Sequence, residues 1–189
     1  KTIVKNGYKD DINGLKLDIE DDPVGGVKRI VYREIEEDYN LDNLKVKKGD
    51  VLVDVGAHVG IVSIYLAKRY PQATIIAVEP NPNTATRLER NIEANHVDNV
   101  TVYRNAIAGE EKDIELGGDG STNSGGHSMF SKGNDTFLVH AITLKQLLKP
   151  YKKVKLLKLD CEGGEFSVTD PDVLKKVESM RGEFHKNYG

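Results

Sequence analysis

Short runs of aliphatic residues, many of them β-branched, alternate along the chain with longer segments of helical periodicity. The predicted strands are 51–55, 74–78, 100–103, 137–142, 154–160 and a last one near 180–185. Between strands, apolar residues recur at helical spacing, as Ala85, Leu88 and Ile92 do. This alternation is typical of strand-helix-strand units and predicts an α/β fold with a mostly parallel sheet sandwiched by helices.

The first two strong strands each carry a carboxylate at or next to their carboxyl ends. Residues 51–55 are continuously apolar except for Asp54, which predicts a strand buried on both faces. Residues 74–78 run into Glu79, and Asn81 then stands where a helix cap is expected, with proline after it. We therefore expect a ligand site at the carboxyl edge of the sheet, near these acids.

Outside the alternating region, the chain predicts two peripheral features. Residues 27–34 and 35–41 are rich in apolar and β-branched residues and predict edge strands or a hairpin. We accordingly divide a single domain into an N-terminal part, 1–45, packed on a core that spans 46–189. Residues 117–135 are rich in Gly, Ser, Asn and Thr, which is typical either of a surface loop or of a lid over the substrate.

Composition places the chain among ordinary globular domains. Its 189 residues fit one domain, and 38% hydrophobic residues together with 18 glycines argue against disorder. The 27 basic and 30 acidic residues give a net charge of -3, so neither a nucleic acid nor an anionic membrane is an expected partner. Without a membrane-spanning run or a signal-peptide core, we expect a cytoplasmic protein. Because Cys161 is the single cysteine, an intrachain disulfide is excluded.

The turn after the first strand indicates which nucleotide it binds. Dinucleotide-binding folds usually carry G-x-G-x-x-G, whose second glycine lets the backbone approach the pyrophosphate. Here the spacing is Asp54-x-Gly56-x-x-x-Gly60, and His58 occupies the position of that second glycine. The side chain disfavours NAD or FAD, although an NAD(P)-dependent oxidoreductase stays open as an alternative.

The acids favour S-adenosylmethionine, which carries a sulfonium and an ammonium where NAD carries a pyrophosphate. Asp54 is placed to face this cationic methionyl end, and Glu79 is placed to accept hydrogen bonds from both ribose hydroxyls. Dinucleotide folds use the same ribose acid, so Glu79 by itself identifies a nucleoside only. A structural role for Asp54 needs a local donor, which the amides of the turn can supply.

Several motifs in a fixed order resemble the FkbM family of S-adenosylmethionine-dependent methyltransferases. They are VLVDVGAHVG at 51–60, AVEPNP at 77–82, NIEAN at 91–95, NSGGHS at 123–128, LDCEGGE at 159–165 and GEFH at 182–185. The resemblance covers roughly 40–185 and implies a Rossmann-like class I methyltransferase fold with a seven-stranded sheet. Typical members continue beyond the GEFH strand, whereas this sequence stops at Gly189, so the prediction leaves open whether the last strands are present.

The resemblance also implies roles for individual residues. The implied cofactor-binding residues are Asp54, Gly56 and His58 around the methionyl end, Glu79 at the ribose, and Asn81, Asn105 and Ala106 around the adenine. Gly60, in the same turn, is a further implied cofactor-binding residue. Members of the family usually transfer a methyl group to a hydroxyl oxygen. The acceptor is then a small molecule, a sugar or a lipid-linked glycan, which the sequence does not specify.

Methyl transfer to an alcohol needs alignment of the acceptor oxygen and a base for its proton. Asp160 and Glu162 are two residues apart, as are Glu183 and His185, so each pair shares a side of an extended segment. We predict His185 as the general base, Glu162 orienting it or serving as base itself, and Asp160 lining the pocket. The same pairs suit a divalent metal, but nothing in their spacing requires one, and no metal is predicted. A non-catalytic S-adenosylmethionine-binding protein is the second hypothesis.

Overall fold

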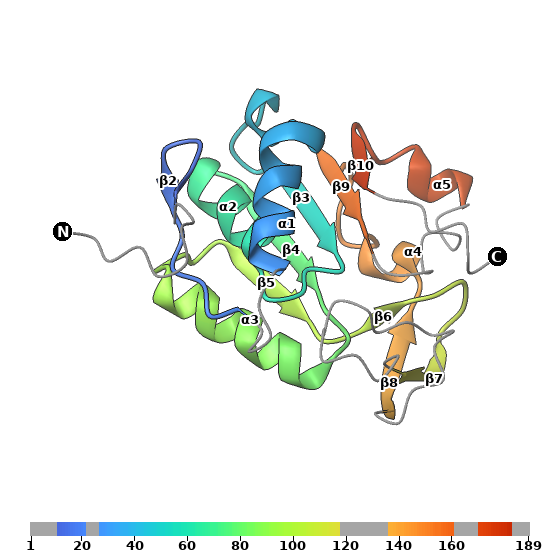
Figure 1. The fold of residues 1–189 in the computed structure, drawn as a ribbon. Helices are drawn as coiled ribbons and strands as arrows, with labels where there is room; N and C mark the ends of the chain where they lie inside the picture. Colours follow the sequence, from blue (N-terminus) through green and yellow to red (C-terminus); the bar gives the residue numbers. More distant parts are fainter. Residues whose placement is uncertain (1–10, 22–26, 118–135, 161–169, 183–189) are drawn as a thin grey trace.

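The computed structural model describes residues 11–21, 27–117, 136–160 and 170–182. Its centre is a sheet of five parallel strands in the spatial order β10-β9-β3-β4-β5 (Figure 1). In that order the strands are β10 (Met180–Gly182), β9 (Leu156–Leu159), β3 (Val51–Val55), β4 (Thr74–Val78) and β5 (Val100–Tyr103). The predicted α/β fold with a parallel sheet is confirmed. Where the resemblance implies seven strands, the described residues contribute five to this sheet.

Helical segments cover both faces of the central sheet. One face carries the helices α1 (Val27–Arg33), α2 (Ile61–Arg69) and α3 (Pro82–Ala94) and a π-helical turn, η1 (Glu34–Asp38). The other face carries α4 (Leu144–Leu147) and α5 (Pro171–Leu174) (Figure 1). Alternate strand residues supply the two layers, so that Leu52 packs toward α2 while Val53 packs toward α4. Each of these strands is therefore apolar on both sides, as its sequence predicts.

Along the chain, β5 leads into a second, smaller sheet. It consists of β6 (Ala106–Ile107), β8 (Thr136–Ile142) and β7 (Lys112–Gly117), in the order β6-β8-β7. The strand predicted at 137–142 is confirmed as β8, which pairs antiparallel with β7 and parallel with β6. β7 was not predicted from the sequence, although its polar and apolar residues alternate as expected for a half-buried strand.

The prediction of edge strands over 27–34 and 35–41 is wrong. These residues form α1 and η1, followed by a short 3-10 turn, η2 (Leu41–Asn43). Val31, Ile35 and Tyr39 recur every four residues and pack on the sheet, and this spacing outweighs the β-branched content. The hairpin in this part of the chain is instead formed by β1 (Asp11–Ile12) and β2 (Leu15–Lys16).

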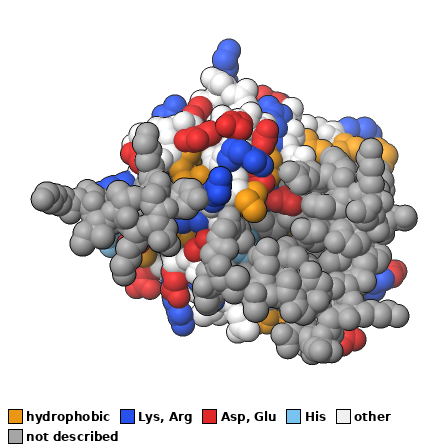
Figure 2. Space-filling model, in the orientation of Figure 1, with side chains coloured by type: hydrophobic (Ala, Val, Ile, Leu, Met, Phe, Trp, Pro, Cys, Tyr) orange, Lys and Arg blue, Asp and Glu red, His pale blue; other side chains and the backbone are white. Residues whose placement is uncertain are grey.

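The described surface mixes charges of both signs. Figure 2 shows acidic and basic side chains interspersed over the upper part of the face in view. Among the described helices, none is long and apolar enough to span a bilayer.

Candidate functional site

The turn between β3 and α2 is held against β4 and α3 at the carboxyl edge of the sheet. Gly56 and His58 have positive φ angles of 77° and 50°, and the Gly56 amide donates to the Val78 carbonyl at 3.0 Å. Gly60, with φ of 92°, caps α2, and a Cβ atom there would lie 2.2 Å from a methyl carbon of Leu88. The glycine spacing that the sequence analysis singled out therefore serves both the tight turn and its close contact with α3.

Glu79 follows β4 and points its carboxylate back at this turn. Its Oε2 accepts the His58 backbone N–H and its Oε1 accepts the Asn81 backbone N–H, each at 2.9 Å. The residue is 7% exposed. Burial raises the pKa of Glu79 to about 7, against the opposing effect of the two backbone hydrogen bonds. A carboxylate offers about four lone-pair positions, so about two stay available for further donors.

Of the residues expected around the adenine, Asn81 precedes β5 in the chain, and Asn105 and Ala106 follow it. Asn81 caps α3 as predicted, because its Oδ1 accepts the backbone N–H groups of Asn83 and Thr84 at 2.9 and 3.2 Å. Asn105 is partly buried and its Nδ2 donates to the His140 carbonyl at 3.0 Å, which ties it to β8. Ala106 is buried in β6. Asn105 and Ala106 thus lie at the junction where β5 leads into the smaller sheet, whereas Asn81 lies at the start of α3.

Asp54 is fully buried and belongs to a group of charges shared by β3 and β9. The Ser63 hydroxyl of α2 donates to its Oδ2 at 2.6 Å, and Lys158 Nζ lies 3.2 Å from its Oδ1. Lys158 Nζ also lies 3.5 Å from Asp160 Oδ2 and donates to the Gly56 carbonyl at 3.2 Å. Ser63 is therefore the hydrogen-bond donor to Asp54 and Lys158 its ion-pair partner, where the structural alternative had considered the turn amides. The buried Oδ1 accepts no hydrogen bond from the residues that the structure describes.

The charge state of Lys158 follows from its surroundings. Burial lowers the pKa of Lys158, whereas the carboxylates of Asp54 and Asp160 raise it. The effect of the carboxylates is the larger one, so the pKa lies above its ordinary value. Lys158 is therefore a buried ammonium with two carboxylate neighbours.

The N-terminal segment closes over the same charges. The Tyr39 hydroxyl donates to Glu34 Oε2 at 3.2 Å, and both residues are buried. Lys158 Nζ lies 6.0 Å from the centre of the Tyr39 ring, and Arg181 Nε of β10 donates to the Tyr39 carbonyl at 3.2 Å. The π-helical turn before Tyr39 thus brings this segment over the carboxyl edge of β9, although the sequence analysis gave it no part in the site.

Of the predicted catalytic residues, the structure places Asp160 at the end of β9 beside Lys158, with a side chain 29% exposed. Glu162 and His185 lie outside the described residues, so their predicted roles are not tested. In the described ranges, no three His, Cys, Asp or Glu side chains gather in a way that could hold a metal ion.

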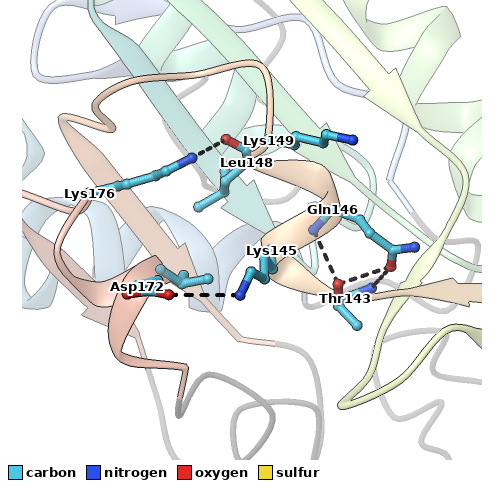
Figure 3. A pocket seen from close by; sticks show the side chains of 8 residues that line it. Thr143, Lys145, Gln146, Leu148, Lys149, Asp172 and Lys176 are labelled. Atoms are coloured by element: carbon cyan, nitrogen blue, oxygen red, sulfur yellow. Dashed lines mark hydrogen bonds and ion pairs between the residues drawn. The ribbon is translucent and has the colours of Figure 1, made fainter.

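A separate pocket of about 370 Å³ opens between α4 and α5 on the other side of the sheet (Figure 3). Its rim carries Lys145, Lys149 and Lys176, and none of the predicted cofactor residues lines it. Lys145 pairs with Asp170 at 3.2 Å. This pocket is therefore distinct from the carboxyl edge.

Lys158 and Ser63 belong to the site but were not predicted from the sequence. The signal for Lys158 was a lysine inside the apolar strand Leu-Leu-Lys-Leu, because a charge in such a strand needs a buried partner. Ser63 carries no such signal, since a serine in a helix is usually exposed and its contact with Asp54 depends on how α2 packs.

Comparisons of the sequence with known proteins find methyltransferases. Residues 54–187 match the family described as the methyltransferase FkbM domain. "Methyltransferase 1" of Beauveria bassiana (strain ARSEF 2860) is 27% identical over 161 residues, which cover 73% of this chain and 64% of that protein. "Methyltransferase sdnD" of Sordaria araneosa is 37% identical over 67 residues, 35% of this chain and 26% of that protein. The chain therefore spans less than two thirds of either relative.

Among solved structures, an rRNA methylase from Streptococcus thermophilus aligns with a TM-score of 0.48 and 8% identity, covering 77% of this chain and 66% of that one. The family match extends over most of the chain and contains the glycine turn, Glu79 and Asp160. This chain belongs to the FkbM family of S-adenosylmethionine-dependent methyltransferases.

Proposed function

We propose that this protein transfers a methyl group from S-adenosylmethionine to a hydroxyl oxygen of a small molecule, a sugar or a lipid-linked glycan. The observation that carries the proposal is the buried Glu79 carboxylate, held by two backbone amides at the end of β4 with lone pairs to spare. Such a carboxylate suits a pair of neighbouring hydroxyl donors, as a ribose offers.

The charges on the neighbouring strands fit the other end of the cofactor. Asp54 and Asp160 together carry two negative charges and Lys158 one positive charge, which leaves the group at -1. When bound, S-adenosylmethionine supplies an electrophilic methyl group on a positively charged sulfur. We assign its methionyl end to Asp54, Gly56 and His58, its ribose to Glu79, and its adenine to the junction at Asn81, Asn105 and Ala106.

The acceptor side rests on the sequence prediction. His185 removes the proton of the acceptor hydroxyl, Glu162 orients the imidazole or serves as the base itself, and Asp160 lines the pocket. A cytoplasmic location and the nature of the acceptor stay predictions of the same kind.

Calorimetry with S-adenosylhomocysteine and with NADH tests the cofactor assignment. We expect the wild-type protein to bind S-adenosylhomocysteine and not NADH, and Glu79→Ala to weaken that binding by at least about tenfold. Binding of NADH alone would favour the dinucleotide-dependent oxidoreductase and end the proposal.

Transfer of a labelled methyl group to a panel of sugars, glycolipids and small alcohols then tests the reaction. Labelled product supports the methyltransferase. Tight cofactor binding without transfer to any hydroxyl would favour a non-catalytic S-adenosylmethionine-binding protein.

A further inference from the structure

A lysine lies in the interior of the sheet, where charged side chains are rare. All four residues of β9 are buried, and the Lys158 side chain is only 4% exposed. In the parallel pairing of β3 with β9, Lys158 is the register partner of Asp54. Asp160 follows two residues later in the chain, so its contact with Lys158 is made on the same side of the sheet.

Lys158 has more partners than neutralisation of Asp54 requires. It bridges two carboxylates from different strands, and it also donates to the Gly56 carbonyl in the glycine turn. The geometry of the turn and the positions of both acids therefore depend on one ammonium group. A strand lysine that served stability alone could be replaced, together with Asp54, by two apolar residues of similar size.

We infer that Lys158 is a positioning residue for the cationic end of the cofactor: it holds Asp54 and Asp160 in place, and its positive charge sets the formal charge of the group that faces the sulfonium at -1. The inference rests on the proposed function, because it names the residue that sets the charge of that same site.

Other ionisable groups face this cluster and contribute to its net charge. Glu34 and Tyr39 approach from the N-terminal segment, Arg181 from β10 contacts the Tyr39 backbone, and Glu79 follows β4. Of these, Glu79 titrates near neutral pH, since burial raises its pKa to about 7. A test of Lys158 must therefore cancel the contribution of Glu79.

The ratio of the affinities for S-adenosylmethionine and S-adenosylhomocysteine provides that cancellation. The two ligands share the adenosine and amino acid parts and differ in the methyl group and the positive charge of the sulfur. At pH 8.5, above the pKa of about 7 of Glu79, this residue carries the same charge in the wild type and in the variants. A general loosening of the fold changes both affinities alike. The ratio responds to the net charge that faces the sulfur.

We would measure this ratio by calorimetry at pH 8.5 for the wild-type protein and for Lys158→Met. Without the lysine, the group loses its positive charge and its formal charge becomes -2. The ratio should then be about tenfold higher than in the wild type, the size expected for a unit charge acting over about 10 Å at an effective dielectric constant of about 20.

Three further variants complete the test. Lys158→Arg keeps the cation and should restore the ratio of the wild type. Lys155→Met, just before β9, removes a lysine whose partner is the surface residue Glu178, and it should leave the ratio unchanged. Asp160→Asn removes one negative charge at a partly exposed position, so it should fold and lower the ratio by about tenfold.

The outcomes separate this inference from the proposed function. If the wild type binds neither ligand, both fail. If it binds both ligands and the ratio in Lys158→Met equals that of the wild type, only the role of Lys158 is overturned. Should Lys158→Met not fold, Asp160→Asn decides, because an unchanged ratio in that variant contradicts the charge balance on which the inference depends.

Discussion

Binding of S-adenosylhomocysteine should become tighter as pH rises from 6 to 8, because the acid assigned to the ribose titrates in that range. Burial raises the pKa of Glu79 to about 7 in the free protein. The ribose hydroxyls donate hydrogen bonds, so the ionised carboxylate is the form that binds them best. Ligand binding then lowers the pKa of Glu79 and releases a proton near neutral pH.

The size of the effect follows from the fraction of Glu79 that is ionised. With a pKa of about 7, roughly 10% of Glu79 carries its charge at pH 6 and roughly 90% at pH 8. The affinity should therefore rise by about tenfold across this interval and level off above it. The sign is opposite for stability without ligand: a carboxyl pKa raised from 4.5 contributes stability that is fully present below pH 4.5 and is lost as pH rises from there through about 7.

Calorimetry in buffers of different ionisation enthalpy measures both the affinity and the protons released. Glu79→Gln removes the titration, so its affinity should be at least about tenfold weaker at pH 8 and nearly constant with pH. Part of that loss is expected because the amide supplies N–H donors where two backbone N–H groups need acceptors. The pH dependence is thus the diagnostic quantity.

Glu89→Gln is the matched control, because Glu89 is an exposed glutamate of α3 that pairs with Arg104. This variant should keep the wild-type pH dependence. An affinity in the wild type that does not change between pH 6 and pH 8 would refute the reasoning, as would an unaltered pH dependence in Glu79→Gln.

Three other substitutions test separate parts of the site. Gly60 has a positive φ, and Gly60→Ala places a Cβ atom against a leucine of α3, so it should lower the free energy of unfolding by about 1–3 kcal/mol, measured by thermal unfolding. Gly109→Ala is the control, because Gly109 has open space around it, and it should be nearly neutral. Ser63→Ala removes a buried hydrogen bond to the Asp54 carboxylate and should cost about 1.5–3 kcal/mol in urea unfolding; a cost below about 0.5 kcal/mol would contradict this contact. His185→Ala should reduce turnover by about 10²-fold or more with cofactor affinity nearly intact, and full activity would transfer the role of base to Glu162 or to neither.

The central sheet was predictable because its strands are buried on both faces. A run such as 51–55 has only one polar residue, and a parallel sheet covered by helices is the arrangement that buries such a run. The N-terminal helices were not predicted, since Val31, Ile35 and Tyr39 lie among other apolar residues that suggest strands when read locally. Their helical spacing becomes decisive only with the sheet surface on which they pack.

The candidate site was predictable in its residue types and less so in its contacts. Asp54 and Glu79 stand at strand ends, which the pattern of apolar residues locates. Their partners depend on tertiary structure: the backbone amide that meets Glu79 is aimed by the positive φ of His58, and the cation beside Asp54 comes from Lys158, 104 positions later in the chain. A single sequence does not specify such pairings.

The register between β3 and β9 also bears on how the chain reaches its fold. Parallel strands of nearly uniform aliphatic residues can slide past one another at little energetic cost, because each alignment buries similar surface. In the observed register Lys158 lies opposite Asp54, which is favourable. A slip by one residue would place a leucine opposite Asp54 and would point the Lys158 ammonium into the apolar layer beneath α4. The single pair of opposite charges thereby penalises every misaligned sheet and selects one arrangement of the middle strands.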